Sequence, residues 1–155
     1  MCFYEMAEIL FKGDISDEYW DYVYRLLKEV LQVADANGEM KVLVLLFKVK
    51  MLFVLGIEPV INCCVKCRNG TNVVFLSVKE GGLMCSRCFS GEEEILIDAK
   101  LIPIVRAMFK IPLGRFMDVV VDKDDLANLD EFIVAYYEVY SGISLGSRIV
   151  VKSPL

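Results

Sequence analysis

The sequence contains no histidine among its 155 residues. Catalytic arrangements that pair a serine or a cysteine with a histidine base are therefore excluded. Zinc sites that combine cysteine with histidine are excluded for the same reason. A zinc shell made of four thiolates has no open position for water, so a metal held in that way organises structure and does not activate water.

Other familiar signatures are absent as well. The chain has no nucleophile–base pair, no phosphate-binding loop and no dinucleotide-binding fingerprint, so we expect it not to be an enzyme. Its N-terminus has neither a basic region nor a small-residue cleavage site, which argues against a signal peptide. The acidic residues 122–125 do not make a calcium loop, because Ala127 stands where glycine is required. We expect Asp122 or Asp124 to cap a helix instead.

An apolar segment at residues 42–57 resembles a membrane span at first sight. It is shorter than the ~20 residues needed to cross a bilayer, and Lys48 and Lys50 interrupt it. Hydrophobic residues make up 56% of the chain, enough for a sizeable core. We therefore expect a helix over residues 40–55 that is buried on most sides, and no membrane association.

Four cysteines form two pairs with the spacing of metal ligands: Cys64 with Cys67, and Cys85 with Cys88. Two residues separate the members of each pair, so one tight turn directs both sulfurs at a single ion, and 17 residues separate the pairs. The strand-like residues 72–77 and a Gly-Gly turn lie between them. This pattern predicts a zinc ribbon over residues 60–90, with one structural Zn²⁺ per chain. A ribbon that keeps the fold without the metal is the main alternative.

The other two cysteines have simpler interpretations. Cys63 precedes the first pair, and its spacing from Cys67 is also tolerable for zinc, so the choice of Cys64 stays open at this point. Cys2 lies in an apolar N-terminal run and is most simply a small core residue. Reduced thiols that hold zinc fit the cytosol, so we expect a cytoplasmic protein.

Apolar residues at helical spacing predict a mainly α fold, a helical bundle with an inserted ribbon. Residues 1–59 and 91–155 would form the bundle. A short helix is expected at residues 3–11, and Ser16 would cap a second helix that Asn37-Gly38 ends. The expected buried side chains of the second helix are Trp20, Val23, Tyr24, Leu27, Val30 and Leu31. A further helix starts or kinks at Pro103. The last helix runs from about Leu126 to Ser141 and buries Phe132, Ile133, Tyr136 and either Val139 or Tyr140.

The net charge of −5 is unevenly distributed. Residues 1–40 carry nine acidic and three basic residues, whereas residues 41–91 carry two and seven, and residues 99–115 carry none and four. These cations either neutralise the formal −2 charge of a four-thiolate zinc centre or form a surface for nucleic acid or an acidic peptide.

The order of the motifs resembles that of the C-terminal part of the RecO family of bacterial recombination mediators. The matching motifs are F-K-V-K-M-L at residues 47–52, L-G-I-E-P at 55–59, the two cysteine pairs, F-L-S at 75–77 and G-G-L-M-C at 81–85. Arg68 stands where the family usually has glycine after the second cysteine, and Ile57 replaces an aromatic residue. The OB-fold that begins family members does not precede these motifs.

The resemblance implies a bacterial, nucleoid-associated DNA repair mediator that binds single-stranded DNA, the acidic C-terminal tail of single-strand-binding protein, and RecR, and helps to load RecA. The ribbon residues expected to contact phosphates are Lys66, Arg68, Lys79 and Arg87. The residues expected to bind the acidic peptide are Lys41, Phe47, Lys48 and Lys50, although Phe47 could equally be a core residue and the lysines could extend along apolar surface. The alternative is a zinc-stapled helical scaffold that binds only proteins.

Overall fold

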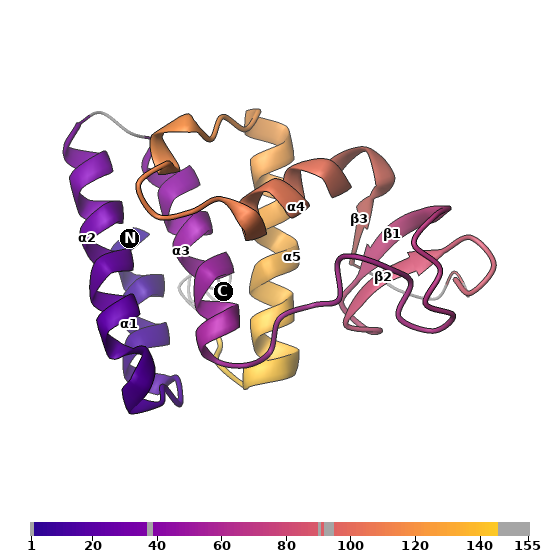
Figure 1. The fold of residues 1–155 in the computed structure, drawn as a ribbon, viewed down its shortest axis with the longest axis horizontal. Helices are drawn as coiled ribbons and strands as arrows, with labels where there is room; N and C mark the ends of the chain where they lie inside the picture. The colour runs from indigo at the N-terminus through magenta and orange to yellow at the C-terminus, as the bar shows by residue number, and fades with distance from the viewer. Residues whose placement is uncertain (1, 37–38, 90, 92–94, 146–155) are drawn as a thin grey trace, which may run out of the picture.

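The computed structural model describes residues 2–36, 39–89, 91 and 95–145, except for the side chain of Cys2, whose expected place in the core lies outside this description. Within these residues the chain is mainly helical, with one small antiparallel sheet (Figure 1). The helices are α1 (Cys2–Lys12), α2 (Trp20–Asp35), α3 (Met40–Val54), α4 (Ile102–Lys110) and α5 (Lys123–Ser141). The strands are β1 (Val73–Ser77), β2 (Gly82–Cys85) and β3 (Leu96–Asp98), and 3₁₀ turns lie at Asp17–Tyr19, Ala99–Leu101 and Phe116–Asp118.

Helix α3 is the centre of the bundle, as the sequence predicted. Of its 15 residues, 12 are buried, and α1, α2, α4 and α5 all pack against it. A helix that is apolar around most of its circumference must be surrounded in this way. None of the helices in the described ranges is long and apolar enough to span a membrane.

Helix α2 buries a narrower face than its sequence suggests. Val23, Leu26 and Val30 are buried, but the expected core residues Trp20, Tyr24 and Leu31 are exposed, so that part of the prediction is wrong. The physical reason is that α2 packs mainly on α3, which covers one narrow stripe of its surface and leaves the neighbouring apolar stripe open.

The ends of the helices follow local rules. Ser16 occupies the cap position before the 3₁₀ turn that leads into α2, but only its carbonyl takes part, accepting from the Tyr19 N–H at 3.0 Å. Pro103 lies in the first turn of α4, so the helix begins there without a kink. The Asp122 carboxylate caps α5 by accepting from the Asp124 N–H at 3.2 Å. Asn37-Gly38 lies outside the described residues.

Helix α5 begins three residues earlier than expected and buries more of its surface. The predicted Phe132, Ile133 and Tyr136 are buried, and so is Tyr137. Val139 and Tyr140 are both exposed, so the prediction that one of them is buried is wrong. The Tyr137 hydroxyl donates to the backbone carbonyl of Lys48 at 2.6 Å, which joins α5 to α3 inside the core.

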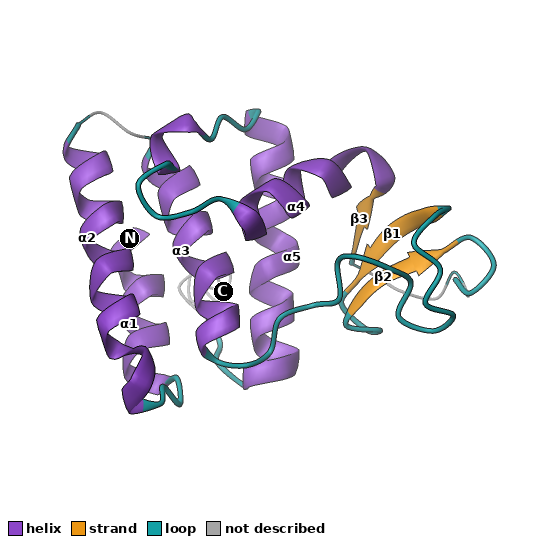
Figure 2. Cartoon of the chain, viewed as in Figure 1, coloured by secondary structure: helices purple, strands orange, loops and turns teal. Residues whose placement is uncertain are grey.

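The ribbon contains a third strand that the sequence did not predict (Figure 2). The sheet order is β2-β1-β3, and both pairings are antiparallel. Leu76 of β1 lies opposite Leu83 of β2 and Ile97 of β3. Because β3 lies beyond residue 90, the sheet extends past the expected ribbon range of 60–90, and the division into two domains remains a prediction.

Side chains of α4 and α5 attach the ribbon to the bundle. Arg106 Nε donates to the Ile61 carbonyl at 2.8 Å. The Tyr140 hydroxyl donates to the Val78 carbonyl at 2.7 Å and lies 3.1 Å from the Lys79 carbonyl. The ribbon thus lies at one end of the long axis, with α1 and α2 at the other (Figure 1).

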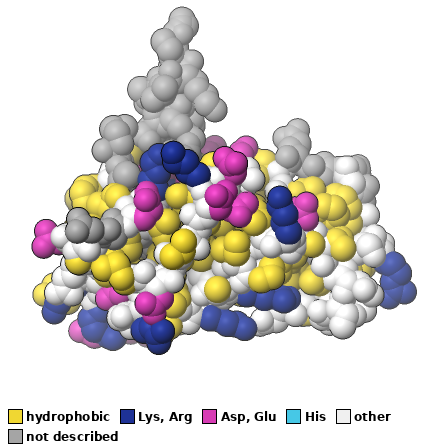
Figure 3. Space-filling view, turned by 90° about the horizontal axis from the view of Figure 1, so that it is seen from above, with side chains coloured by type: hydrophobic (Ala, Val, Ile, Leu, Met, Phe, Trp, Pro, Cys, Tyr) yellow, Lys and Arg dark blue, Asp and Glu magenta, His cyan; other side chains and the backbone are white. Residues whose placement is uncertain are grey.

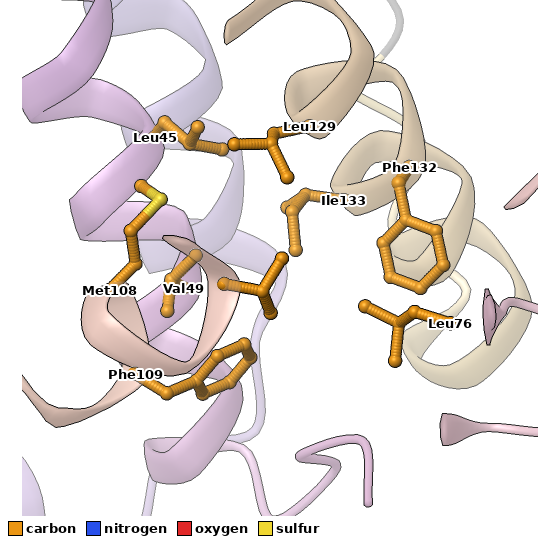
Figure 4. A pocket seen from close by; sticks show the side chains of 9 residues that line it. Leu45, Val49, Leu76, Met108, Phe109, Leu129, Phe132 and Ile133 are labelled. Carbon is orange, nitrogen blue, oxygen red and sulfur yellow. The ribbon is translucent and has the colours of Figure 1, made fainter. Parts of the chain in front are cut away.

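A small apolar cavity lies between α3, α4, α5 and the sheet (Figure 4). Its volume is about 10 Å³, and apolar side chains line it throughout: Leu45, Val49, Leu76, Val105, Met108, Phe109, Leu129, Phe132 and Ile133. A space of this size holds at most about one water molecule. The cavity is therefore a packing defect and not a ligand site.

Candidate metal centre and surrounding surface

The four cysteine sulfurs of the two predicted pairs converge on one point. Their Sγ atoms, from Cys64, Cys67, Cys85 and Cys88, all lie within 4.8 Å of one another. The Sγ atoms of Cys67 and Cys85 are 3.7 Å apart, much farther than a disulfide bond would allow. All four side chains are free thiols.

Local backbone geometry produces this convergence. In the first turn, the Arg68 N–H donates to the Cys64 carbonyl at 3.0 Å, and in the second, the Phe89 N–H donates to the Cys85 carbonyl at 3.1 Å. Val73 at the start of β1 lies opposite Cys85 at the end of β2, so the pairing of the two strands brings the turns together. The spacing within each pair brings two sulfurs together, and the register of the hairpin then brings the two pairs together.

The close packing of four thiols separates their proton affinities. Burial raises the pKa of the Cys64 thiol, but hydrogen bonds from the backbone of Cys67, Cys85 and Lys66 outweigh burial and lower it to about 6. Hydrogen bonding to Cys85, together with burial, raises the pKa of the Cys88 thiol to about 12. One sulfur thus favours the thiolate and another keeps its proton, as expected where four potential negative charges share one small space.

Zn²⁺ fits this donor set. Zn–S bonds of about 2.3 Å place the sulfurs of a regular tetrahedron roughly 3.8 Å apart, close to the 3.7 Å between Cys67 and Cys85. Cys63 is a free thiol that is not part of the cluster, so the geometry favours Cys64 as the ligand. The four clustered cysteines could hold a metal ion, and a bound Zn²⁺ would replace the thiol protons and tie the two turns together.

A pair of aromatic rings packs beside the cluster, and the sequence analysis predicted this role for neither of them. The rings of Phe75 and Phe89 pack at 4.3 Å between centroids. Phe89 also packs against the buried group formed by Cys64, Met84 and Cys85. The only sequence signal for this role is that Phe89 directly follows the second cysteine pair.

Arg68 takes the backbone conformation that glycine would favour. Its φ of 66° lies in the left-handed region, where a residue with a Cβ is strained by roughly 1–2 kcal/mol. The side chain is exposed, so it gains no compensating packing in the core. The first cysteine turn therefore closes at the cost of local strain.

We expect Arg68→Gly to raise the free energy of unfolding by about 1 kcal/mol, because it removes this strain and loses part of the gain to the greater flexibility of glycine when unfolded. Thermal melting of the zinc-loaded protein measures the change. Arg68→Ala is the matched control, since it removes the same charge but keeps the Cβ. An equal stabilisation in both variants would show that charge, and not backbone strain, limits the turn.

The predicted phosphate-contacting residues all lie on the surface of the ribbon. Lys66, Arg68, Lys79 and Arg87 are exposed. Lys66 is partly neutralised by Glu80, with 3.7 Å between Nζ and Oε2. The other three make no ion pair with any described residue. Glu80 is the sole acidic residue among residues 60–90.

The four residues expected to bind a peptide do not form a surface together. Phe47 is 0% exposed and Lys48 1% exposed, and both lie inside the bundle. Lys50 is buried as well, and its Nζ donates to the Phe109 carbonyl at 2.8 Å. Only Lys41 is exposed. The reason is that neighbouring helices cover α3 on nearly every side, so Lys48 and Lys50 pair inside the bundle and only Lys41, at the start of the helix, reaches solvent.

The fold and the four-thiolate site define a class of protein: a helical bundle that carries a metal-binding ribbon between its third and fourth helices. Comparison with protein-family models identifies the family, because the model for the C-terminal part of recombination protein O matches residues 7–149. The chain belongs to the RecO family, as the motifs had indicated. Membership in a family of recombination mediators agrees with the expectation that the chain is not an enzyme.

Characterised relatives are bacterial DNA repair proteins. The chain is 28% identical over 144 residues to the DNA repair protein RecO of Bacillus subtilis, covering 92% of this chain and 56% of that protein. It is 32% identical over 128 residues to RecO of Halalkalibacterium halodurans, covering 82% and 50% respectively. The chain thus spans about half the length of these relatives. The comparison with solved structures gave no match.

Proposed function

We propose that this chain is a recombination-mediator module that binds single-stranded DNA through the exposed cations of its ribbon. The family match over residues 7–149 carries the proposal. The ribbon supports it physically, because it presents four cations and one acidic residue between positions 60 and 90. A Zn(Cys)₄ centre would contribute a charge of −2, so some of this positive charge remains for phosphates.

The uneven charge would orient the molecule toward DNA. Residues 1–40 carry nine acidic and three basic residues, and α1 and α2 lie at the end of the molecule away from the ribbon (Figure 1). Seen from above, Lys and Arg side chains lie along the lower edge of the view, with Asp and Glu among them, and others lie elsewhere on this face (Figure 3). A phosphate backbone would be attracted to the ribbon end and repelled from the α1–α2 end.

The partners follow from the proposed role. They are single-strand-binding protein, RecR and RecA, with the chain acting in the bacterial cytoplasm near the nucleoid. Lys41 is the one expected peptide-binding residue with an accessible charge. The alternative is a zinc-stapled scaffold that binds proteins only, and the exposed aromatic side chains of α1 and α2 favour it.

Titration of fluorescent single-stranded DNA at several salt concentrations separates these two functions. We expect binding that weakens steeply with salt, by roughly 0.7 in logarithmic slope for each phosphate contact. The double variant Arg68→Glu and Arg87→Glu should reduce this slope by about 1.4. Lys28→Glu, which changes an exposed lysine on α2, is the matched control and should leave the slope unchanged. Absence of binding by the wild-type chain at low salt would leave only the scaffold function.

A further inference from the structure

Large aromatic side chains are exposed where α1 turns into α2, a region called here the α1–α2 corner (residues 11–24). Phe11 is 88% exposed, Trp20 44% and Tyr24 62%. Trp20 and Tyr24 are four residues apart, so they lie on the same side of α2. Clusters of exposed aromatic residues are rare on monomers, and Trp and Tyr are enriched among the residues that dominate protein–protein binding.

The fold leaves the corner uncovered. Helices α1 and α2 both pack on α3, and they do so through other residues, such as Ile9 of α1 and Leu26 of α2, which are fully buried. Phe11, Trp20 and Tyr24 do not belong to the packed core. Packing of the core therefore does not explain why these aromatic residues are present.

The corner is also negatively charged. Asp14, Asp17 and Glu18 are exposed, and none of them makes an ion pair with a described residue. Two nearby cations are already paired, Lys12 with Glu8 at 2.8 Å and Arg25 with Asp21 at 3.1 Å. A third, Lys28, has its Nζ 5.6 Å from the centre of the Tyr24 ring. Asp14, Asp17 and Glu18 are thus left without an ion pair among the described residues.

We propose that the α1–α2 corner is a docking surface for a basic amphipathic helix of another protein. The apolar side of that helix packs on the three aromatic residues, and its Lys and Arg residues face the three acidic groups. The negative charge disfavours nucleic acid and anionic lipid. It also disfavours a symmetric contact between two copies, which would place the same acidic groups against each other. This surface goes beyond the proposed DNA function, because it involves neither the ribbon nor phosphate.

Trp20 provides a direct test, since it is the sole tryptophan of the chain. The probe is a synthetic helical peptide of about 18 residues, roughly five turns, with Leu on one side and Lys on the other. Its binding should shift the Trp20 emission to shorter wavelength, and the dissociation constant should rise with salt. The control peptide, in which Glu replaces every Lys, should produce no shift.

Variants of the protein then locate the site. Phe11→Ser and Tyr24→Ser should each weaken binding by at least about tenfold, and Asp17→Asn with Glu18→Gln should remove most of the salt dependence. Met117→Ser and Val120→Ser, at exposed apolar residues elsewhere, should change nothing. Equal binding by the Glu peptide, unchanged affinity in the corner variants, or the same emission shift with phosphatidylserine vesicles or on self-association would each overturn the proposal.

Discussion

Cys85→Ser is expected to abolish stoichiometric zinc binding and to lower the melting temperature by more than about 10 °C. Three sulfurs cannot close the four-thiolate shell, and binding of structural zinc is coupled to folding, with apparent free energies of about 10–16 kcal/mol in zinc-finger peptides. In a domain of this size, roughly 1 kcal/mol corresponds to 2–4 °C, so even a fraction of that energy produces a large shift.

The loss of ordered structure in Cys85→Ser should be confined mostly to the ribbon. The bundle has its own buried core around α3, where 12 of 15 residues are buried, so far-UV circular dichroism should retain most of its helical signal. Metal content by elemental analysis and melting by calorimetry are the measurements. Cys63→Ser is the matched control: Cys63 adjoins the cluster but lies outside it. One zinc per chain in Cys85→Ser, or loss of zinc in Cys63→Ser, would show that the ligand set is wrong.

The clustering of the four cysteines was predictable because short stretches of sequence determine it. Two residues between the members of each cysteine pair fix each turn, and a hairpin with a Gly-Gly turn brings the turns together. The turn requires glycine at position 82, since a Cβ there would lie 2.5 Å from the Val60 carbonyl oxygen. The third strand was not predictable in the same way, because Leu96–Asp98 has only three residues and becomes a strand by pairing with distant β1.

The errors in predicting which side chains are buried have a different cause. Helical spacing shows which residues share a side of a helix, but not how much of that side a neighbour covers. Trp20 and Tyr24 belong to the apolar side of α2, yet α3 covers only its other edge. Lys48 is the opposite case, because a lysine in an apolar helix is expected to reach solvent. Its burial depends on two carboxylates supplied by α1 and α5, which no local pattern near Lys48 reveals.

Lys48→Met is expected to lower the free energy of unfolding by about 3 kcal/mol. Lys48 is 1% exposed, and its Nζ lies 3.0 Å from Glu5 Oε1 and 2.5 Å from Asp130 Oδ1. Removing one member of a buried ionic group leaves the others uncompensated, which typically costs about 3–5 kcal/mol. The lower figure applies because the carboxylate side chains are 13% and 25% exposed and keep some contact with water.

A compensating variant distinguishes lost charge balance from lost packing. Methionine is similar in length to lysine, so little cavity forms, and adding Glu5→Gln and Asp130→Asn should restore most of the stability because no buried charge then remains unpaired. Chemical denaturation measures the loss and its restoration, with Lys41→Met, at the exposed start of α3, as the control that should change stability by less than about 0.5 kcal/mol. If the triple variant is no more stable than Lys48→Met, the three charges do not act as one group, and the ionic contact between α1, α3 and α5 contributes through packing alone.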